Sequence, residues 1–333
     1  MKKITGAYFV ACMLLIISIW CGAAIGSVHI PFEILWNQAV DETAANIFWK
    51  IRLPRVLLAG LVGASLAIAG AAFQGLLKNP LADPYTLGVS SGASVGAVMT
   101  IFLSISIPAV GLYTLPIFSM IGAIFTMIIV MTFARAIDRS LKMETLILTG
   151  VIFSSFLGSL ISLMIALSGE ELRQVVGWLL GSVSMRGWPY VQMIIPFVVI
   201  GSLMLWTQRR ELNVLLYGEE RARHLGVNVK RSKYIILAGG SMLTGAAVAV
   251  SGTIGFVGLV VPHMTRMIWG SDHRHLLPLS FLNGATLLIV CDLVARTIIL
   301  PRELPIGVIT AFIGAPVFSY IFYKQRKSKG VRA

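Results

Sequence analysis

Charged side chains are scarce in this sequence. Aspartate, glutamate, lysine and arginine make up 12% of its 333 residues, whereas a soluble domain carries about 25%. Hydrophobic residues make up 57%, and the mean hydropathy is +0.86. This leaves too little polar side chain to cover the surface of a globule in water. A soluble enzyme, a nucleic-acid-binding protein and a disordered chain are therefore disfavoured, and an integral membrane protein is predicted.

Motifs of nucleotide and metal chemistry are also missing. The dipeptide Gly-Lys does not occur, so the chain has no P-loop and does not hydrolyse nucleotide by that route. No H-E-x-x-H helix and no cysteine–histidine cluster are present. The three cysteines, Cys12, Cys21 and Cys291, lie in apolar runs without the spacing of a metal site or a disulfide framework. We predict no cofactor, no metal site and no catalytic residue.

Carboxylates are almost absent from the apolar runs. Asp292, four residues before Arg296, is the one acidic residue inside a predicted span. A proton-coupled carrier normally places Asp, Glu or His along its path. This absence disfavours a self-sufficient secondary transporter, although sodium coupling through backbone carbonyls would leave no such trace.

What the sequence does contain is a series of long apolar runs. A membrane-spanning helix needs about 20 mostly apolar residues, and runs without alternation favour helices over a β-barrel. The seventh and eighth runs nearly join through Ser251-Gly252-Thr253, which leaves nine or eleven spans open. The first run follows Lys2 and Lys3 and is longer than the core of a signal peptide, so we interpret it as a retained span. Ten spans are predicted, roughly at residues 4–26, 54–76, 86–107, 112–134, 145–168, 189–207, 234–251, 253–269, 276–298 and 305–323.

The distribution of lysine and arginine predicts the orientation of these spans. With the N-terminus inside, 20 of the 27 basic residues fall in inner segments and 7 in outer segments. Such a bias places both termini in the cytoplasm of a multi-pass protein of the cell membrane. The longest outer connections are predicted at about 27–53 and 169–188, and the longest inner one at about 208–233. No room is left for a soluble domain, so residues 1–333 form one transmembrane domain.

Two short segments, one in each half of the chain, resemble each other. Residues 73–76 read FQGL and precede Pro80, and residues 256–259 read FVGL and precede Pro262. An Ala-rich run with a glycine precedes each segment, at 67–70 and at 249–252. With these runs included, the first set begins in a span running inward and the second in a span running outward. This pattern predicts a weak inverted repeat, a feature of many transporters.

Glycine is abundant, at 32 residues, and recurs at helical spacing. The pairs Gly60 with Gly63, and Gly92 with Gly96, place small residues on one helix face. Small residues allow helices to approach closely where no hydrophobic effect drives their association. We interpret them as packing residues; the alternative is that they line a wide pathway.

Arginines stand at an unexpected place in the second span. Arg52 and Arg55 open this helix, at the positive end of its dipole and on the outer side, against the overall charge bias. Contact with lipid headgroups and docking of an acidic partner on the outer face are the two interpretations. Arg296 has a simpler explanation, because it lies near the C-terminal end of its helix with Asp292 as an i,i+4 partner.

The long inner connection contains a short amphipathic segment. Gly218 and Gly226 bracket about two helical turns that mix apolar and charged side chains. From composition alone, a lipid-interface helix and a partner-docking helix are equally compatible with this pattern.

Several ordered motifs resemble those of a known family. In this order, and over residues 50–323, they are similar to the FecCD-type permeases, the membrane subunits of type II ABC importers for ferric siderophores, haem and cobalamin. The motifs are RLPR (52–55), GLLKNPLADP (75–84), LGVSSGA (87–93), the 218–226 segment, GFVGLVVPH (255–263) with DHR (272–274), and ELPIGV (303–308) with GAP (314–316).

The resemblance implies an all-α membrane protein with about ten transmembrane helices in the type II importer permease fold. It implies a homo- or heterodimer of permeases, two cytoplasmic ATP-binding subunits that carry the ATPase activity, and an extracytoplasmic substrate-binding protein. Arg52, Arg55 and Arg296 match the arginines that dock the binding protein. Met143, Glu144 and Thr145 occupy the position of the cytoplasmic gate, although they are not the small polar residues expected there. A segment of about 212–229 matches the coupling helices, with Gly218, Glu219, Glu220, Arg221, Ala222, Arg223, Leu225 and Gly226 facing the ATPase.

The function implied is inward transport of an iron-siderophore-type chelate by alternating access, in a transport subunit that is not itself an enzyme. Cobalamin and haem are the alternatives within the family. An ion-coupled secondary transporter is the alternative outside it. Lipid is an expected partner, and nucleic acid is not.

Overall fold

The computed structural model describes residues 2–26 and 41–330, which form helices and connections without a β-strand. The elements are α1 (Lys2–Ala24), α2 (Glu42–Asn46), the π-helical η2 (Ile47–Arg52), α3 (Leu53–Leu76), the 3-10 helix η3 (Pro84–Leu87), α4 (Val89–Phe102), the 3-10 helix η4 (Gly111–Tyr113), α5 (Thr114–Ile137), α6 (Met143–Leu167), α7 (Leu172–Leu179), α8 (Gly187–Thr207), α9 (Arg209–Leu215), α10 (Glu219–His224), α11 (Val229–Ser251), α12 (Val257–Trp269), α13 (His273–Thr297) and α14 (Ile306–Gly330).

A helix lies at each of the ten predicted spans, and the all-helical prediction is confirmed for the described residues. Seven helical stretches there are long and apolar enough to cross a membrane. Helices α4 and α12 have 14 and 13 residues, too few to cross about 30 Å of hydrocarbon alone at 1.5 Å per residue. The count of ten membrane-crossing helices therefore stays a prediction.

The predicted outer connection over 27–53 contains helix in its second half; residues 27–40 lie outside the described part. The side chain of Asp41 accepts a hydrogen bond from the amide of Ala44 (2.9 Å) and begins α2. This helix runs through η2 into α3, so helical backbone extends from Glu42 to Leu76. A local N-cap, which a hydropathy count does not detect, moves the start of the helix.

The seventh and eighth predicted spans are separate helices. Helix α11 ends at Ser251, and Gly252 follows with a φ of +71°, a conformation that side chains rarely adopt. The break ends at Phe256, and α12 begins at Val257. The seventh and eighth apolar runs therefore form two helices and not one continuous helix.

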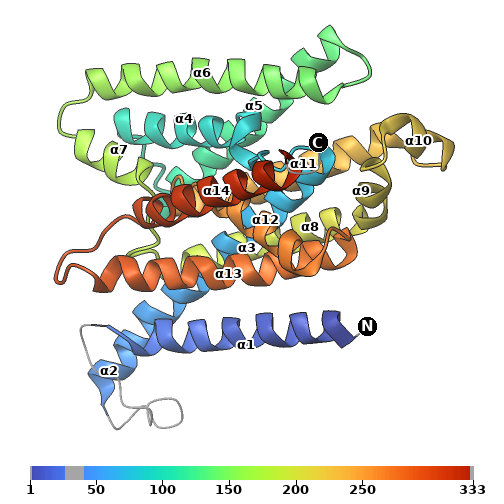
Figure 1. Cartoon of the computed structure of the whole chain (residues 1–333). Coiled ribbons are helices and arrows are strands. Elements are labelled where there is room, and N and C mark those ends of the chain that lie inside the picture. The colour runs from blue at the N-terminus through green and yellow to red at the C-terminus, as the bar shows by residue number, and fades with distance from the viewer. Residues whose placement is uncertain (1, 27–40, 331–333) are drawn as a thin grey trace.

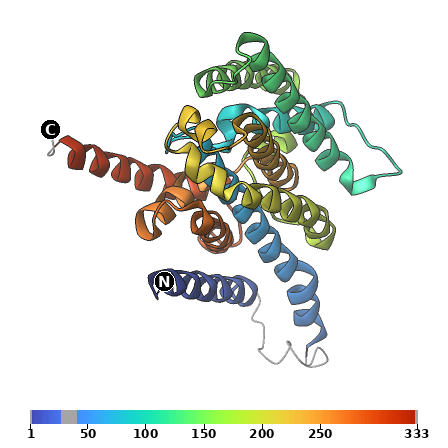
Figure 2. The same cartoon turned by 90° about the vertical axis from the view of Figure 1, so that its right-hand side faces the viewer.

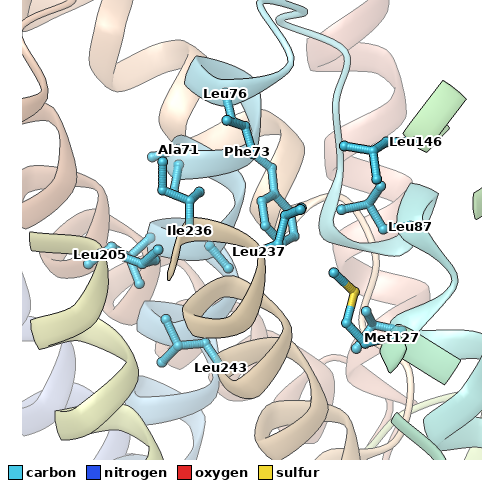
Figure 3. Packing of buried hydrophobic residues seen from close by; sticks show 14 of the residues in the cluster. Ala71, Phe73, Leu76, Leu87, Met127, Leu146, Leu205, Ile236, Leu237 and Leu243 are labelled. Carbon is cyan, nitrogen blue, oxygen red and sulfur yellow. The ribbon is translucent and has the colours of Figure 1, made fainter. Parts of the chain in front are cut away.

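Helix α3 is the centre of the bundle and is buried along most of its length. It packs against α8, α11, α12 and α13. Figure 3 shows its C-terminal part, where Phe73 and Leu76 lie among apolar side chains that include Ile236 and Leu237 of α11. A helix that is apolar on all sides suits this central place, since every face meets another helix or lipid.

Glycine makes the closest of these contacts possible. A Cβ atom on Gly63 of α3 would collide with the carbonyl oxygen of Gly284 of α13, and one on Gly284 would collide with the carbonyl of Gly63. Gly92 of α4 and Gly122 of α5 face each other in the same way. The glycines at helical spacing are therefore packing residues, as interpreted from the sequence.

We expect Gly63→Val to lower the free energy of unfolding by about 1–3 kcal/mol, because the new side chain overfills the α3–α13 contact. The measurement is the melting temperature of the purified protein in detergent. Gly6→Val is the matched control, since nothing lies within 4 Å of a Cβ at that position. Equal melting temperatures for both variants would contradict the assigned contact.

The two segments that resemble each other in sequence contact each other in space. The side-chain amide of Gln74 donates to the carbonyl oxygens of Gly258 (3.2 Å) and Leu259 (3.1 Å). A Cβ on Gly70, one turn earlier, would collide with the carbonyl of Gly258. The two segments thus join α3 to the start of α12.

The bundle has two distinct ends. In Figure 1, α10 and the turn between α5 and α6 lie at one end of the bundle, and the start of α1 and the end of α14 point the same way. Helices α2 and α7 lie at the other end. Helix α6 lies at the edge of the bundle and is largely exposed, and α14 stands out from the body in Figure 2. Apolar side chains exposed on these helices face lipid or another protein rather than the core.

Candidate functional site: two opposite ends of the bundle

The three arginines singled out from the sequence come together at the end of the bundle that contains α2. Arg52, Arg55 and Arg296 line one cavity of about 500 Å³, which we call the arginine cavity. Its other lining residues are Gly26, Ile47, Ile51, Leu300, Pro301 and Glu303. Arg296 lies more than 240 residues from Arg52 and Arg55 in the sequence, so only the fold brings it to the same opening.

Arg55 is the centre of a buried ion-pair network. Its guanidinium lies 2.9 Å from a carboxylate oxygen of Asp292 and 2.8 Å from one of Glu303. The side chain of Asp292 is 1% exposed and also faces Arg296, with 3.6 Å between the nearest charged atoms. The i,i+4 partnership of Asp292 with Arg296 is present, but Arg55 is the closer partner of this carboxylate.

Arg52 and Arg296 contact the C-terminal end of α1. Arg52 donates to the carbonyl oxygens of Ala24 (2.7 Å) and Ala23 (3.3 Å), and Arg296 donates to the carbonyl oxygen of Gly22. The last carbonyls of a helix lack intrahelical partners and carry partial negative charge. Because the helix continues back to Glu42, Arg52 does not stand at a helix N-terminus, and the expectation of an unfavourable position in the helix dipole is wrong. Its guanidinium instead stabilises the end of α1, an arrangement the sequence did not reveal.

Glu303 closes the network at the surface. Its side chain is 43% exposed and also accepts a hydrogen bond from the hydroxyl of Ser184 (2.8 Å). Partial burial raises the pKa of Glu303, but the hydrogen bond and positive charge of Arg55, together with Ser184 and Arg296, hold this pKa below its usual value. Among the described residues, three arginines and Glu303 line the cavity, and the carboxylate of Asp292 is buried behind them.

The opposite end of the bundle holds the predicted coupling segment. Gly218 has φ +116° and ψ 150°, and Gly226 has φ +81°, so both glycines adopt backbone conformations that other residues avoid. They bracket α10, where Ala222 is buried, whereas the side chains of Tyr217 and Leu225 are about 70% exposed. The remaining predicted coupling residues line this surface: Glu219 is half-buried, and Glu220, Arg221 and Arg223 are exposed.

The predicted gate residues lie at the start of α6, at the same end as α10 (Figure 1). Met143 packs partly against the main apolar core, Glu144 is exposed in the first helical turn, and Thr145 is half-buried. The turn before them is held by Asp138, whose carboxylate accepts hydrogen bonds from the amide and hydroxyl of Ser140.

The structure adds one feature that sequence analysis missed. A concave apolar surface of about 600 Å³ lies between the end of α7, the 252–256 break and α14, with Leu180, Phe256 and Phe312 in its wall. Phe256 has a φ of +68°, a strained conformation for a bulky residue. Neither the strain nor the meeting of these distant segments has a sequence signal. The described residues contain no cluster of histidine, cysteine and carboxylate groups that could hold a metal ion.

Comparison with known proteins gives a consistent set of matches. Residues 14–324 match the model of the FecCD transport family. The uncharacterised ABC transporter permease protein YvrB of Bacillus subtilis (strain 168) is 57% identical over 332 residues, covering 96% of this chain and 94% of the relative. The hemin transport system permease protein HmuU of Yersinia pestis is 39% identical over 323 residues, covering 95% of both chains.

A solved structure is also similar over nearly the whole chain. It is an inward-facing conformation of a metal-chelate type ABC transporter, with a TM-score of 0.86 and 34% sequence identity. The match covers 95% of this chain and 98% of that one.

Proposed function

Because this chain belongs to the FecCD transport family, we propose that it carries an iron-siderophore-type chelate into the cytoplasm by alternating access. The chain is a multi-pass permease subunit of an ABC importer and not an enzyme; it pairs with another permease and with ATP-binding subunits that hydrolyse ATP. The observation that carries the proposal is the pair of sites at opposite ends of the bundle, a charged cavity at one and the exposed α10 at the other. One suits an outer partner and the other an inner one.

We propose that the arginine cavity docks the substrate-binding protein. Three arginine side chains line this concave surface, and an acidic side chain from a partner would suit it. Glu303 already occupies one face of Arg55, so an incoming carboxylate would join or replace it there.

The α10 surface is proposed as the contact with the ATPase. The exposed Tyr217 and Leu225 supply apolar area, and Arg221 and Arg223 supply charge around it. Met143, Glu144 and Thr145 form the proposed cytoplasmic gate, at the same end. In this arrangement ten spans form one domain over 1–333, both termini are cytoplasmic, and ATP-driven movement of α10 tilts the spans about the axis of the permease pair.

An iron-siderophore-type chelate is chosen because two of the similar proteins bear names that refer to Fe(3+) dicitrate and to metal chelates. The relative named for hemin keeps haem as the alternative. The test is uptake of a panel of labelled compounds by cells that lack this gene, with and without a plasmid copy. The panel contains a ferric hydroxamate, a ferric catecholate, haem and cobalamin. Restored uptake of a ferric siderophore supports the proposal. If only uptake of haem or of cobalamin is restored, that compound is the substrate and the siderophore proposal is wrong. If uptake survives loss of the ATPase, the ABC importer mechanism is wrong.

Topology can be measured by cysteine labelling after Cys12, Cys21 and Cys291 have been replaced. A cysteine at the exposed Glu170, next to α7, should react with an impermeant reagent in intact cells. A cysteine at the exposed Glu220 of α10 should react only after the cells are opened, because the basic residues near α10 favour the cytoplasmic side. Labelling of position 220 in sealed cells would reverse the orientation.

Docking at the arginine cavity predicts a graded effect of charge at Arg52. Arg52→Gln and Arg52→Glu both lose the contacts with the end of α1, so they share any loss of stability. We expect Arg52→Glu to bind the substrate-binding protein at least tenfold more weakly than Arg52→Gln at low salt, and this difference should shrink as salt is added. Equal affinity of the two variants at every salt concentration would assign Arg52 to a structural role alone.

A further inference from the structure

Lys233 of α11 is a buried cation that joins three elements at the α10 end of the bundle. Its side chain is 1% exposed, although lysine is almost never fully buried without partners. Its ammonium nitrogen lies 2.8 Å from the carboxylate of Glu219, the first residue of α10. The same nitrogen donates to the backbone carbonyl oxygens of Ser140 (3.1 Å) and Leu141 (2.8 Å), in the turn before α6.

These contacts use the full donor capacity of the side chain. A lysine ammonium has three hydrogen-bond donors, and here it meets one carboxylate and two carbonyls. A buried charge that lost one of these acceptors would be left without compensation for its lost hydration. The three elements are therefore held to the same point, and separating them is costly.

Both elements that Lys233 joins are short and constrained. Helix α10 follows Gly218, and its Ala222 is buried against the bundle. On the other side, the turn before α6 includes Leu141, which is 1% exposed and has a φ of +51°. The turn leads directly into Met143–Thr145, two residues after the carbonyl of Leu141 that Lys233 contacts.

We propose that Lys233 is a positioning residue that transmits movement of α10 to the start of α6. When the ATPase displaces α10, Glu219 moves with it, and Lys233 transfers this displacement to the 140–141 turn. The start of α6 then moves together with α10 instead of independently. This inference rests on the proposed docking of the ATPase at α10, and it assigns a role to a residue outside the coupling segment.

The experiment measures movement of α10 and movement of the start of α6 separately. Single spin labels are placed at the exposed positions Arg221, on α10, and Glu144, on α6, in a cysteine-free permease reconstituted with its partner permease and ATPase. The measured quantity is the change in label mobility on addition of ATP with vanadate. Lys233→Met and Glu219→Gln each remove one side of the ion pair, and Lys230→Met is the control, an exposed lysine one turn earlier on α11.

We expect both labels to respond to nucleotide in the parent protein and in Lys230→Met. In Lys233→Met and in Glu219→Gln, the response at 221 should remain within twofold, and the response at 144 should fall at least fivefold. The double variant should lose no more than Lys233→Met alone, because both changes break the same link. Since Glu219 is half-exposed, its glutamine variant also tests the link if Lys233→Met fails to fold.

Three results would overturn this inference. A normal response at 144 in both single variants would show that α6 moves without the link. Loss of the response at 221 as well would show that Lys233 only holds α10 in place. Additive losses in the double variant would show that the two side chains act separately. By contrast, a parent protein in which position 221 does not respond at all would refute the docking of the ATPase at α10, not the link.

Discussion

Arg55→Met should remove most of the folded subunit from the membrane. The substitution leaves the carboxylate of Asp292, which is 1% exposed, with only the more distant Arg296 as a cationic partner. Breaking a buried ion pair by removing one partner costs about 3–5 kcal/mol, because the remaining charge is not rehydrated. Arg296, at 3.6 Å, offsets only part of this cost. The measurement is the amount of monodisperse permease recovered in detergent and its melting temperature.

A second substitution separates this explanation from a loss of packing. Arg55→Met combined with Asp292→Leu removes both charges, and apolar replacement of a buried pair is often neutral. We expect the double variant to recover most of the lost stability, although Glu303 also loses its contact with Arg55. If the double variant is less stable than Arg55→Met alone, the network is not what stabilises this end of the bundle.

This first prediction also changes how mutations at the arginine cavity are interpreted. Loss of uptake in an Arg55 variant would follow from misfolding even if Arg55 never touched a partner. Arg52 is the more informative position for docking, because it donates to backbone carbonyls at the end of α1, whereas loss of Arg55 removes a counter-charge from the buried carboxylate of Asp292.

Gly218→Val should abolish ATP-driven uptake and leave the subunit inserted in the membrane. The φ of +116° and ψ of 150° at Gly218 belong to a region that is essentially restricted to glycine, and a side chain there costs about 1–3 kcal/mol. We expect the backbone to relieve this strain by turning α10, which would move Tyr217 and Leu225 away from the proposed contact with the ATPase. The measurement is co-purification of the ATPase, together with uptake of the substrate identified by the panel.

Gly169→Val is the matched control, since no atom crowds a Cβ at that position and its φ is not positive. It lies beside α7, at the end of the bundle away from α10 (Figure 1). Uptake should stay near the parent level there. If Gly218→Val transports normally and retains the ATPase, α10 is a lipid-interface helix, and the coupling role assigned to it is wrong.

Sequence patterns predicted the helices well where the signal is local or repeated. Apolar runs located a helix at each expected span, and glycine spacing predicted the close contacts of Gly63 and Gly92. Hydropathy failed where a capping residue or a backbone break decides the boundary. Asp41 begins a helix inside a predicted connection, and the positive φ of Gly252 separates α11 from α12.

The candidate sites divide along the same line. Composition alone determined a membrane protein, because 12% charged residues cannot cover a soluble surface, and ordered motifs identified the family. Only the tertiary structure decided which charges meet. It placed Arg55 between Asp292 and Glu303, turned Arg52 toward the end of α1, and buried Lys233 against Glu219 and the turn before α6. Ion pairs act over a few ångströms in space, and no sequence periodicity encodes a contact between residues that the chain separates by tens or hundreds of positions.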